Sequence, residues 1–272
     1  MTHSSPWRRT TPAPPVRMVH LGLGAFHKAH QAWFTDHANA AGTPAQAWGI
    51  AAFTGRRPDA AEALTRQDGL FTLVTRGPQD DTAETVASIV APHAGDDGAR
   101  WRGHLADPQV GVVTLTVTER GYRPGADGGL DLADADVAAD LGLLRGATVE
   151  PPAHPAARTA PGRVVDGLRA RLEAGGAPVA VVSCDNLPDN GAVLRRVTLE
   201  LADAVDPALA RWVEASVSFV STMVDRITPA TTAEDRATVR ALTGRERNAE
   251  RSIAATDRSL GIGAISNALG RG

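Results

Sequence analysis

Several residue types are scarce in this chain of 272 residues, which contains one cysteine, one tyrosine and 4% aromatic residues in total. A single cysteine, Cys184, excludes an intramolecular disulfide bond and a cysteine-rich metal site. No apolar run approaches the roughly 18 residues of a membrane-spanning helix, and no block of lysine and arginine stands out. We therefore expect neither a nucleic acid nor a membrane as a partner.

The remaining composition is typical of a globular protein. Hydrophobic residues make up 43% of the chain, charged residues 22%, and the formal net charge is −3. This length and composition allow one large domain or two ordinary ones. The segment from Met1 to Pro15 is polar and rich in proline, and it lacks the apolar core of a signal peptide. We expect a disordered leader there, and a cytoplasmic protein.

Short apolar runs alternate with helix-like segments, and this order predicts an α/β fold with a doubly wound, mostly parallel sheet and flanking helices. Phe71–Thr75 and Glu84–Val90 alternate between apolar and polar residues, as half-buried strands do. The other expected strands are Val16–Leu21, Ala47–Phe53, Val110–Thr118 and Val179–Ser183. The expected helices are Ala25–Ala40, Asp59–Thr65, Arg163–Ala174 and Gly191–Ala204. In the first of these helices, helical spacing places five side chains near one face: Phe26, Ala29, Trp33, Phe34 and His37.

A glycine turn follows the first strand and precedes the first helix. Gly22 can adopt a backbone conformation that other residues avoid, and Gly24 lets a pyrophosphate approach the main chain. The third position of the usual G-x-G-x-x-G pattern is His27. The turn therefore indicates dinucleotide binding, although many tight turns between a strand and a helix bind nothing.

The end of the second strand bears on the choice of cofactor. An acidic residue there would bind the adenosine ribose of NAD, but no acid occurs between Phe53 and Asp59. Arg56 or Arg57 could face the 2′-phosphate of NADP, and a solvated basic loop is an equally good interpretation. The preference between the two cofactors stays open at this stage.

Polar clusters follow three further apolar runs. Thr118 and Glu119 come after the third buried strand, where ligands bind in doubly wound sheets, and a solvated ion pair is the alternative. Ser183–Asn190 contains Asn186, which offers a donor and an acceptor to a polyhydroxylated substrate. Asp225 precedes Pro229 and is either a pocket residue or half of a structural pair with Arg226.

Two further groups of residues are weaker candidates. His20, His27, His30 and His37 suggest a metal cluster, but only Asp36 is placed to complete a ligand set, so we expect packing or hydrogen bonding and no metal. Cys184 has no evident base partner, which argues against a nucleophile. Asn190 is expected to cap the helix that follows it.

Taken together, the segments resemble the long-chain mannitol dehydrogenase family, which includes polyol dehydrogenases and the reductases of fructuronate and tagaturonate. The matching segments are VHLGLGAFHKAHQAWFTD (19–36), QDGLFTLVTRG (67–77), TLTVTERGY (114–122), SCDNLPDNGAVLRR (183–196) and MVDRITPATT (223–232). They occur in the family's order. The combination of SCDNLP with MVDRITP is much more specific than the glycine turn, and it does not fit a methyltransferase-like nucleotide binder.

The resemblance implies a Rossmann-like nucleotide-binding domain over residues 16–244, with NAD as the cofactor, or NADP, and no catalytic metal. Members transfer a hydride between the nicotinamide and a polyol or ketose, or a hexonate and its keto form. It assigns cofactor contacts to Gly22, Gly24, Phe26, His27, Thr118 and Glu119. It assigns substrate contacts to Asn186 and Asp225.

The resemblance stops after about Gly244. Residues 245–272 contain many arginines and no aromatic residue, which predicts a weak helix followed by a loose tail. The helical second domain of the family, with its catalytic lysine, is not recognised. The resemblance places the chain's only lysine, Lys28, near the cofactor diphosphate and away from the site of hydride transfer. We expect a truncated member, or a non-catalytic nucleotide-binding fragment, that associates with itself through exposed apolar surface.

Overall fold

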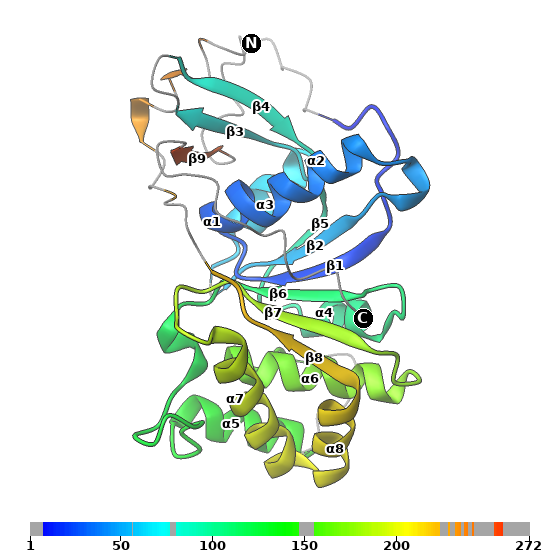
Figure 1. The fold of residues 1–272 in the computed structure, drawn as a ribbon, viewed down its shortest axis with the longest axis vertical. Helices are drawn as coiled ribbons and strands as arrows, with labels where there is room; N and C mark the ends of the chain where they lie inside the picture. Colours follow the sequence, from blue (N-terminus) through cyan, green and yellow to red (C-terminus); the bar gives the residue numbers. More distant parts are fainter. Residues whose placement is uncertain are drawn as a thin grey trace.

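The computed structural model of this chain describes residues 8–55, 57–76, 80–146, 155–223, 228, 232–234, 237–238, 241 and 253–257. A six-stranded sheet in the order β5-β2-β1-β6-β7-β8 runs through its centre (Figure 1), and all five neighbouring pairs are parallel. Its strands are β1 (Val16–Leu21), β2 (Gly49–Phe53), β5 (Ile89–His93), β6 (Val112–Leu115), β7 (Val179–Ser183) and β8 (Val217–Val220). The strand order runs outward in both directions from β1 and β6. The predicted doubly wound, Rossmann-like sheet is confirmed.

Helices cover the sheet on two sides. One set consists of α1 (Ala25–His27), the π-helical turn η1 (Lys28–Ala32), α2 (Trp33–Ala41) and α3 (Asp59–Arg66). The other set consists of α4 (Gly98–Ala106), α5 (Ala135–Leu144), α6 (Ala160–Glu173), α7 (Asn190–Val205) and α8 (Pro207–Ser216). Two short 3-10 turns, η2 (Pro44–Gln46) and η3 (Glu119–Tyr122), lie outside these layers. No helix in the described parts of the chain is long and apolar enough to cross a membrane.

Two apolar clusters form the core because side chains alternate between the faces of a strand. Ala51 and Phe53 of β2 join the larger cluster, which includes residues of α4 to α8 such as Leu168. Ile50 and Ala52 of the same strand join the smaller cluster with residues of η1 and α3. The central strands are therefore fixed from both faces.

A second, three-stranded sheet in the order β4-β3-β9 lies beside the first helix layer. Its strands are β3 (Phe71–Arg76), β4 (Thr82–Val86) and β9 (Ile253–Asp257); β4 pairs with β3 antiparallel and β9 pairs with it parallel. The tail was expected to be a weak helix, but its described part is this strand. β3 was expected to be half-buried, but its first five residues are buried because both its neighbours and the first helix layer enclose it.

The prediction of one strand over Glu84–Val90 is wrong, because this segment contains parts of two strands. The chain leaves β4 at Val86 and enters β5 at Ile89, in the other sheet. Two hydrogen bonds to η1 and α2 fix the two residues between β4 and β5. The Ala87 amide donates to Asp36 Oδ1 (2.9 Å), and the Ser88 hydroxyl donates to the Ala32 carbonyl (2.6 Å). These contacts connect distant residues, so the local pattern does not show them.

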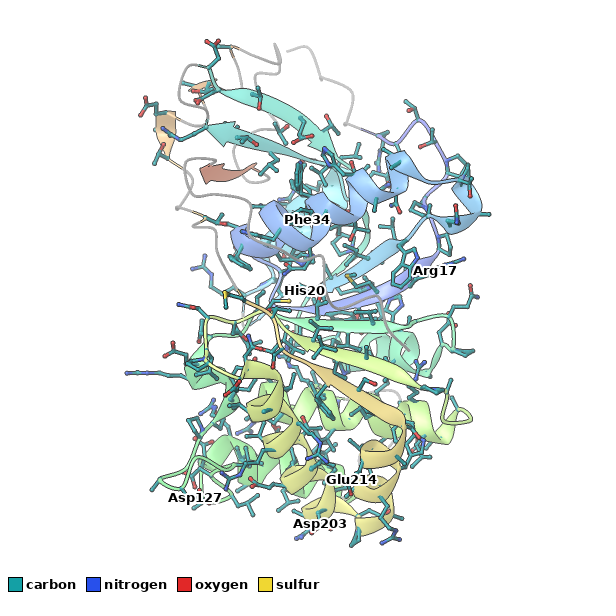
Figure 2. The ribbon with its side chains drawn as sticks, viewed as in Figure 1. Arg17, His20, Phe34, Asp127, Asp203 and Glu214 are labelled. Atoms are coloured by element: carbon teal, nitrogen blue, oxygen red, sulfur yellow. The ribbon has the colours of Figure 1, made fainter. Side chains whose placement is uncertain are left out.

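The first helix also differs from its prediction. The segment Ala25–Ala41 is helical, but the π turn at Lys28–Ala32 interrupts the 3.6-residue repeat. Residues 27–30 are consecutive and all buried, whereas Phe34 is 36% exposed. Figure 2 shows Phe34 on the outer side of this helix. The Trp33 ring still lies beside those of Phe34 and His37, with centroids 4.9 and 4.1 Å apart, so these three members of the expected common face do lie together.

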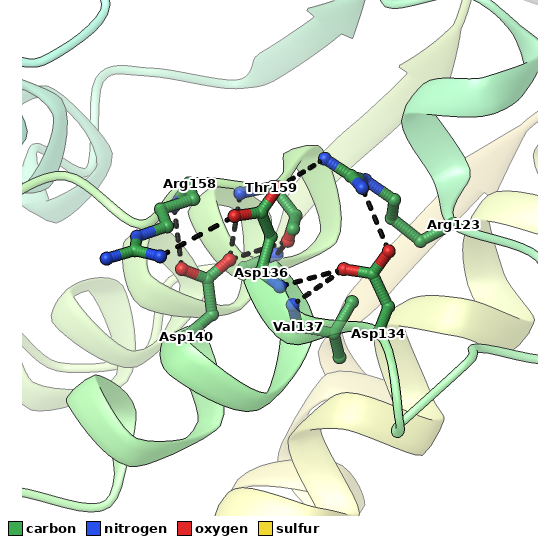
Figure 3. Close-up of polar contacts among 8 residues, drawn as sticks. Arg123, Asp134, Asp136, Val137, Asp140, Arg158 and Thr159 are labelled. Carbon is green, nitrogen blue, oxygen red and sulfur yellow. Dashed lines mark hydrogen bonds and ion pairs between the residues drawn. The ribbon is translucent and has the colours of Figure 1, made fainter.

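A polar cluster fixes the helices that follow η3 (Figure 3). Arg123 lies directly after η3 and pairs with Asp134 (2.9 Å), the N-cap of α5, and with Asp136 (2.8 Å) in the first turn of α5. Asp140 of α5 is 1% exposed and accepts hydrogen bonds from the Thr159 amide (2.8 Å) and hydroxyl (2.7 Å), which begin α6. These contacts hold the segment beyond β6 in one place relative to the helix layer.

Candidate functional site

The glycine turn lies at the carboxyl edge of the six-stranded sheet. Gly22 has φ +112°, and the amides of Gly22 and Leu23 both donate to the Phe53 carbonyl of β2 (2.9 and 2.8 Å). A Cβ at position 22 would lie 2.6 Å from Thr116 Oγ1 and would collide with the Thr116 carbonyl. Gly22 is therefore required by the fold of the turn itself.

Gly24 has a different role. Its backbone is extended (φ −141°), and a Cβ there would meet only the Gly22 carbonyl, at 3.5 Å. Neither conformation nor packing requires glycine at this position. The open side of Gly24, at the start of the first helix, fits the close approach of a pyrophosphate to the main chain.

Two stacked imidazoles support the turn. The rings of His20 and His27 are nearly parallel, with centroids 3.4 Å apart, and both residues are 0% exposed. The Thr116 hydroxyl donates to the Gly22 carbonyl (2.9 Å), so it accepts from His20 Nε2 (3.1 Å). His20 Nδ1 then accepts from the Thr114 hydroxyl (2.7 Å). Figure 2 shows His20 at the centre of the molecule, far from the surface carboxylates Asp203 and Glu214.

Burial keeps these imidazoles neutral. It lowers the pKa of His20 to about 3, and burial, followed by the neighbouring His20, lowers the pKa of His27 well below its ordinary value. A neutral ring suits the surroundings, because an isolated charge inside an apolar layer is costly. His27, expected among the cofactor contacts, is thus a buried partner of His20 beneath the turn.

The segment beyond β6 carries Thr118 and Glu119, which are both exposed. Thr118 has φ 71° and ψ 161°, a region that is open almost only to glycine and costs other residues about 1–3 kcal/mol. Its amide donates to Asp185 Oδ1 (2.8 Å), and its carbonyl accepts from the Gly121 amide (2.9 Å). The sequence predicted the place of Thr118, but no local signal indicated its backbone conformation.

Asp185 follows β7 and is buried, with 7% of its surface exposed. Its second oxygen, Oδ2, accepts from the Tyr122 hydroxyl (2.7 Å), which also lies 2.5 Å from Ser183 Oγ. Burial, together with the charge of Asp185, raises the pKa of Tyr122, so the phenol keeps its proton. Sequence reasoning missed Asp185 and Tyr122 as parts of one network, because they follow different strands and are 63 positions apart.

Asn186 is exposed next to this buried network. Asn190 was expected to cap α7 but is its first residue: its Nδ2 donates to the carbonyls of Asp185 and Thr222, both at 2.8 Å. Asp189 is the N-cap and has a left-handed backbone (φ 49°). The amide of Asn190 thus joins the segments that follow β7 and β8, and the exposed Asn186 lies in the first of these segments.

The remaining candidates are less central. Burial, with the nearby Asp185 charge, raises the pKa of Cys184 to about 12, which makes a thiolate nucleophile unfavourable. Arg57 pairs with Asp59 (2.9 Å), and both are largely exposed.

Lys28 is 6% exposed, its Nζ lies 5.7 Å from the centre of the Phe71 ring, and burial lowers its pKa to about 8. Asp225 and Arg56 lie outside the described residues.

The other two histidines of the suggested metal cluster, His30 and His37, have separate partners. His30 Nδ1 donates to the Phe26 carbonyl (2.8 Å), and His37 Nε2 lies 3.3 Å from Glu84 Oε2. Among the described residues, no group of three or more His, Cys, Asp or Glu side chains could hold a metal ion.

The structure therefore brings three predicted positions to one edge. Thr116 connects Gly22 to the segment beyond β6, and Asp185 connects Thr118 to the segment beyond β7, where Asn186 lies. This is the carboxyl edge of a doubly wound parallel sheet, where nucleotides bind in such folds.

Known proteins are similar to this chain in sequence and in fold. The chain is 42% identical over 223 residues to mannitol 2-dehydrogenase of Cereibacter sphaeroides, and 40% identical over 224 residues to D-mannonate oxidoreductase of Escherichia coli; each alignment covers 80% of this chain and 44% of the relative. The structure of Pseudomonas fluorescens mannitol 2-dehydrogenase in ternary complex with NAD and D-mannitol superposes with a TM-score of 0.79 at 30% identity. That match covers 92% of this chain and 50% of the other.

The chain thus spans about half the length of the relatives it matches. Sequence, fold and the geometry of the glycine turn agree with one another. Because the profile of the mannitol dehydrogenase Rossmann domain matches residues 16–253, this chain belongs to the mannitol dehydrogenase family.

Proposed function

We propose that the chain forms the cofactor-binding part of an NAD(P)-dependent oxidoreductase that acts on a polyol or ketose, or on a hexonate and its keto form. The observation that carries the proposal is the contrast between Gly22, which the fold requires, and Gly24, which it does not. A glycine that neither packing nor conformation needs is explained by a ligand that approaches the main chain.

The residues at the carboxyl edge fit a dinucleotide. Gly22 and Gly24 would receive the pyrophosphate, with Phe26 at the start of the helix beside it. The exposed Thr118 and Glu119 would line the cofactor between the glycine turn and the end of β7. When bound, the nicotinamide supplies the hydride acceptor or donor.

Asn186 is the proposed substrate contact within the described residues. Its amide both donates and accepts, so it can hold a hydroxyl in one state of the substrate and a carbonyl in the other. Asp225 is a second proposed contact, on the basis of the MVDRITP segment. The relatives named above carry mannitol and mannonate in their names, and either class of substrate suits these polar side chains.

A second candidate is a nucleotide-binding module without turnover, and the position of Lys28 favours it. Lysine suits the proton transfer of this chemistry because burial can bring its pKa towards neutrality. The one lysine of the chain lies against Phe71 of β3, in the second sheet, and not at the end of β7 beside Asn186.

Titration of the purified chain with NADH and NADPH, followed by a turnover assay with fructose, mannitol and a hexuronate, tests both candidates. Saturable binding with cofactor-dependent reduction of one substrate supports the oxidoreductase. Binding without turnover supports the module. A chain that binds neither cofactor contradicts both, and Gly24→Ala, which should fold but bind weakly, is the matched control.

A further inference from the structure

The backbone of Thr118 differs from that of two other described residues with positive φ. Arg123 (φ 54°, ψ 52°) and Asp189 (φ 49°, ψ 36°) have the ordinary left-handed helical conformation, which longer side chains tolerate. Thr118, with ψ 161°, lies in the region that glycine alone adopts readily, and its side chain is branched at Cβ. Such a residue keeps this conformation only where its surroundings fix it.

Asp185 supplies that fixation. Its Oδ1 accepts the Thr118 amide (2.8 Å), directly before η3, and its Oδ2 accepts the hydroxyl of Tyr122 (2.7 Å), the last residue of η3. One buried carboxylate therefore holds both ends of this short turn. The contacts are charge-assisted and lie in a region of low dielectric, which makes them strong.

The segment that Asp185 holds, from Thr118 to Tyr122, includes two of the proposed cofactor contacts. Thr118 and Glu119 are exposed, although the carboxylate beneath them is 7% exposed. Thr116, two residues earlier, contacts Gly22 of the glycine turn. Folding alone would be served better by glycine at position 118, because glycine adopts this conformation without strain. A strained residue at the rim of a binding edge is typical of a ligand clamp.

We propose that Asp185 is a positioning residue for cofactor binding: it holds Thr118 in a strained conformation so that Thr118 and Glu119 meet the bound nucleotide. The inference rests on the proposed function, because the segment is assigned to the cofactor there. Asp185 acts through the Thr118 backbone and does not itself touch the ligand.

The test is a double-mutant cycle that measures the dissociation constants for NADH and NADPH by fluorescence titration. Asp185→Ala should weaken binding by about tenfold or more, as expected for the loss of a charged hydrogen bond. Thr118→Gly should bind within about threefold of wild type, and it should restore most of the affinity in the Asp185→Ala background, because glycine needs no clamp.

Two further variants separate positioning from a general structural role. Asp185→Asn retains an oxygen for the Thr118 amide and should keep most of the affinity. Tyr122→Phe removes only the second contact of the carboxylate and should have a smaller effect than Asp185→Ala. If Asp185→Ala does not fold, recovery of folding and binding by the added Thr118→Gly supports the clamp, and failure of the double variant to fold overturns it.

Binding by the wild-type chain separates failure of the proposed function from failure of this inference. Wild-type chain that binds neither cofactor overturns the proposed function and this inference with it. Wild-type binding with unchanged affinity in Asp185→Ala, or with no rescue by Thr118→Gly, overturns the inference and leaves the proposed function standing.

Discussion

The first half of the six-stranded sheet (β5, β2 and β1) and the second half (β6, β7 and β8) hold their carboxyl ends in different ways. In the first half, a glycine with positive φ and two neutral, stacked imidazoles, His20 and His27, shape the turn. In the second half, one carboxylate, Asp185, receives an amide and a phenol. At the carboxyl edge of this sheet, backbone conformation and neutral rings fix the turn in the first half, whereas hydrogen bonds to a carboxylate fix the segments in the second half.

Burial explains the difference. All five residues of β2 are buried, so both of its faces lie in the core. In β7 every second residue is only half-buried, so one face of that strand lies nearer to solvent. Polar groups between two apolar layers must stay neutral, whereas a carboxylate close to an exposed loop can keep its charge when hydrogen bonds compensate it.

The largest expected effect concerns the glycine turn of the first half. Gly22→Ala should lower the free energy of unfolding by about 2–4 kcal/mol, because the new Cβ collides with Thr116 and the backbone needs positive φ. Gly24→Ala should change it by less than about 1 kcal/mol but weaken cofactor binding. Urea denaturation and cofactor titration of both variants measure this. Equal loss of stability in the two would contradict the separate roles.

The next effect concerns the second half. Arg171 of α6 is 1% exposed and donates to four carbonyls, one in the last turn of α4 and three in the segments that lead into β6 and β7: Leu105, Asp107, Ala177 and Pro178. Arg171→Met should cost about 3 kcal/mol, because these acceptors lose their donor inside the protein. Arg195→Met, which removes an exposed pair with Glu214, should cost less than about 1 kcal/mol. If urea denaturation gives similar losses of unfolding free energy for the two variants, Arg171 does not stabilise these segments as proposed.

A pH dependence should arise in the first half. Burial lowers the pKa of His20 to about 3 and that of His93, at the end of β5, to about 4. Because these values lie below those of the unfolded chain, near 6.5, the unfolded chain binds more protons as the pH falls. Stability that is complete above about pH 6.5 should therefore decrease towards pH 4, by at most about 1.4 kcal/mol per pH unit for each group.

Denaturation with urea between pH 7 and pH 4.5 measures that slope. His93 Nε2 lies 3.0 Å from His104 Nε2, and burial, followed by His104, accounts for its lowered pKa. His93→Gln should make the slope shallower. A slope that does not depend on His93 would refute the assignment.

A smaller effect is expected in the choice of cofactor. Because no carboxylate occurs from residue 54 to residue 58, we expect NADPH to bind at least as tightly as NADH. Arg57→Ala should weaken NADPH binding several-fold and leave NADH binding unchanged. Asp59→Asn releases Arg57 from its ion pair and should therefore strengthen NADPH binding. A clear preference for NADH in wild-type chain would reverse this expectation.

The least specific prediction concerns the half-buried face of β7 in the second half. Val182 is half-buried there, and Met223, just beyond β8, is 88% exposed. Apolar surface of this kind favours self-association. Sedimentation velocity over a range of concentrations measures it, and a monodisperse monomer at high concentration would argue against it.

The sequence predicted much of the fold where a pattern is local. The bounds of β1 and β7 match the expected strands, and α6 ends within one residue of the expected Ala174, directly before Gly175 and Gly176, which both have positive φ. α8 was not predicted, although Asp206 caps it and Pro207 begins it, a recognised start signal for a helix. β4 and β5 were merged, because only distant contacts separate them.

The candidate site divides in the same way. Gly22 and Gly24 could be predicted because glycines after a strand are a local signal. The conformation of Thr118 and the role of Asp185 could not, because they depend on a hydrogen bond between residues 67 positions apart. Nor could the burial of Lys28, a residue type that is usually exposed.

The π turn at Lys28–Ala32 has a consequence for comparing this chain with its relatives. A π turn holds one residue more than the α-helical turn it replaces, so it is the structural equivalent of a single-residue insertion. Side chains after Ala32 are displaced around the helix axis by about 100° relative to an uninterrupted α-helix. Deletion of one residue here would therefore rotate α2 as a unit and leave the glycine turn in place. The π turn is thus a point where the register of the helix can change without a change in the glycine turn.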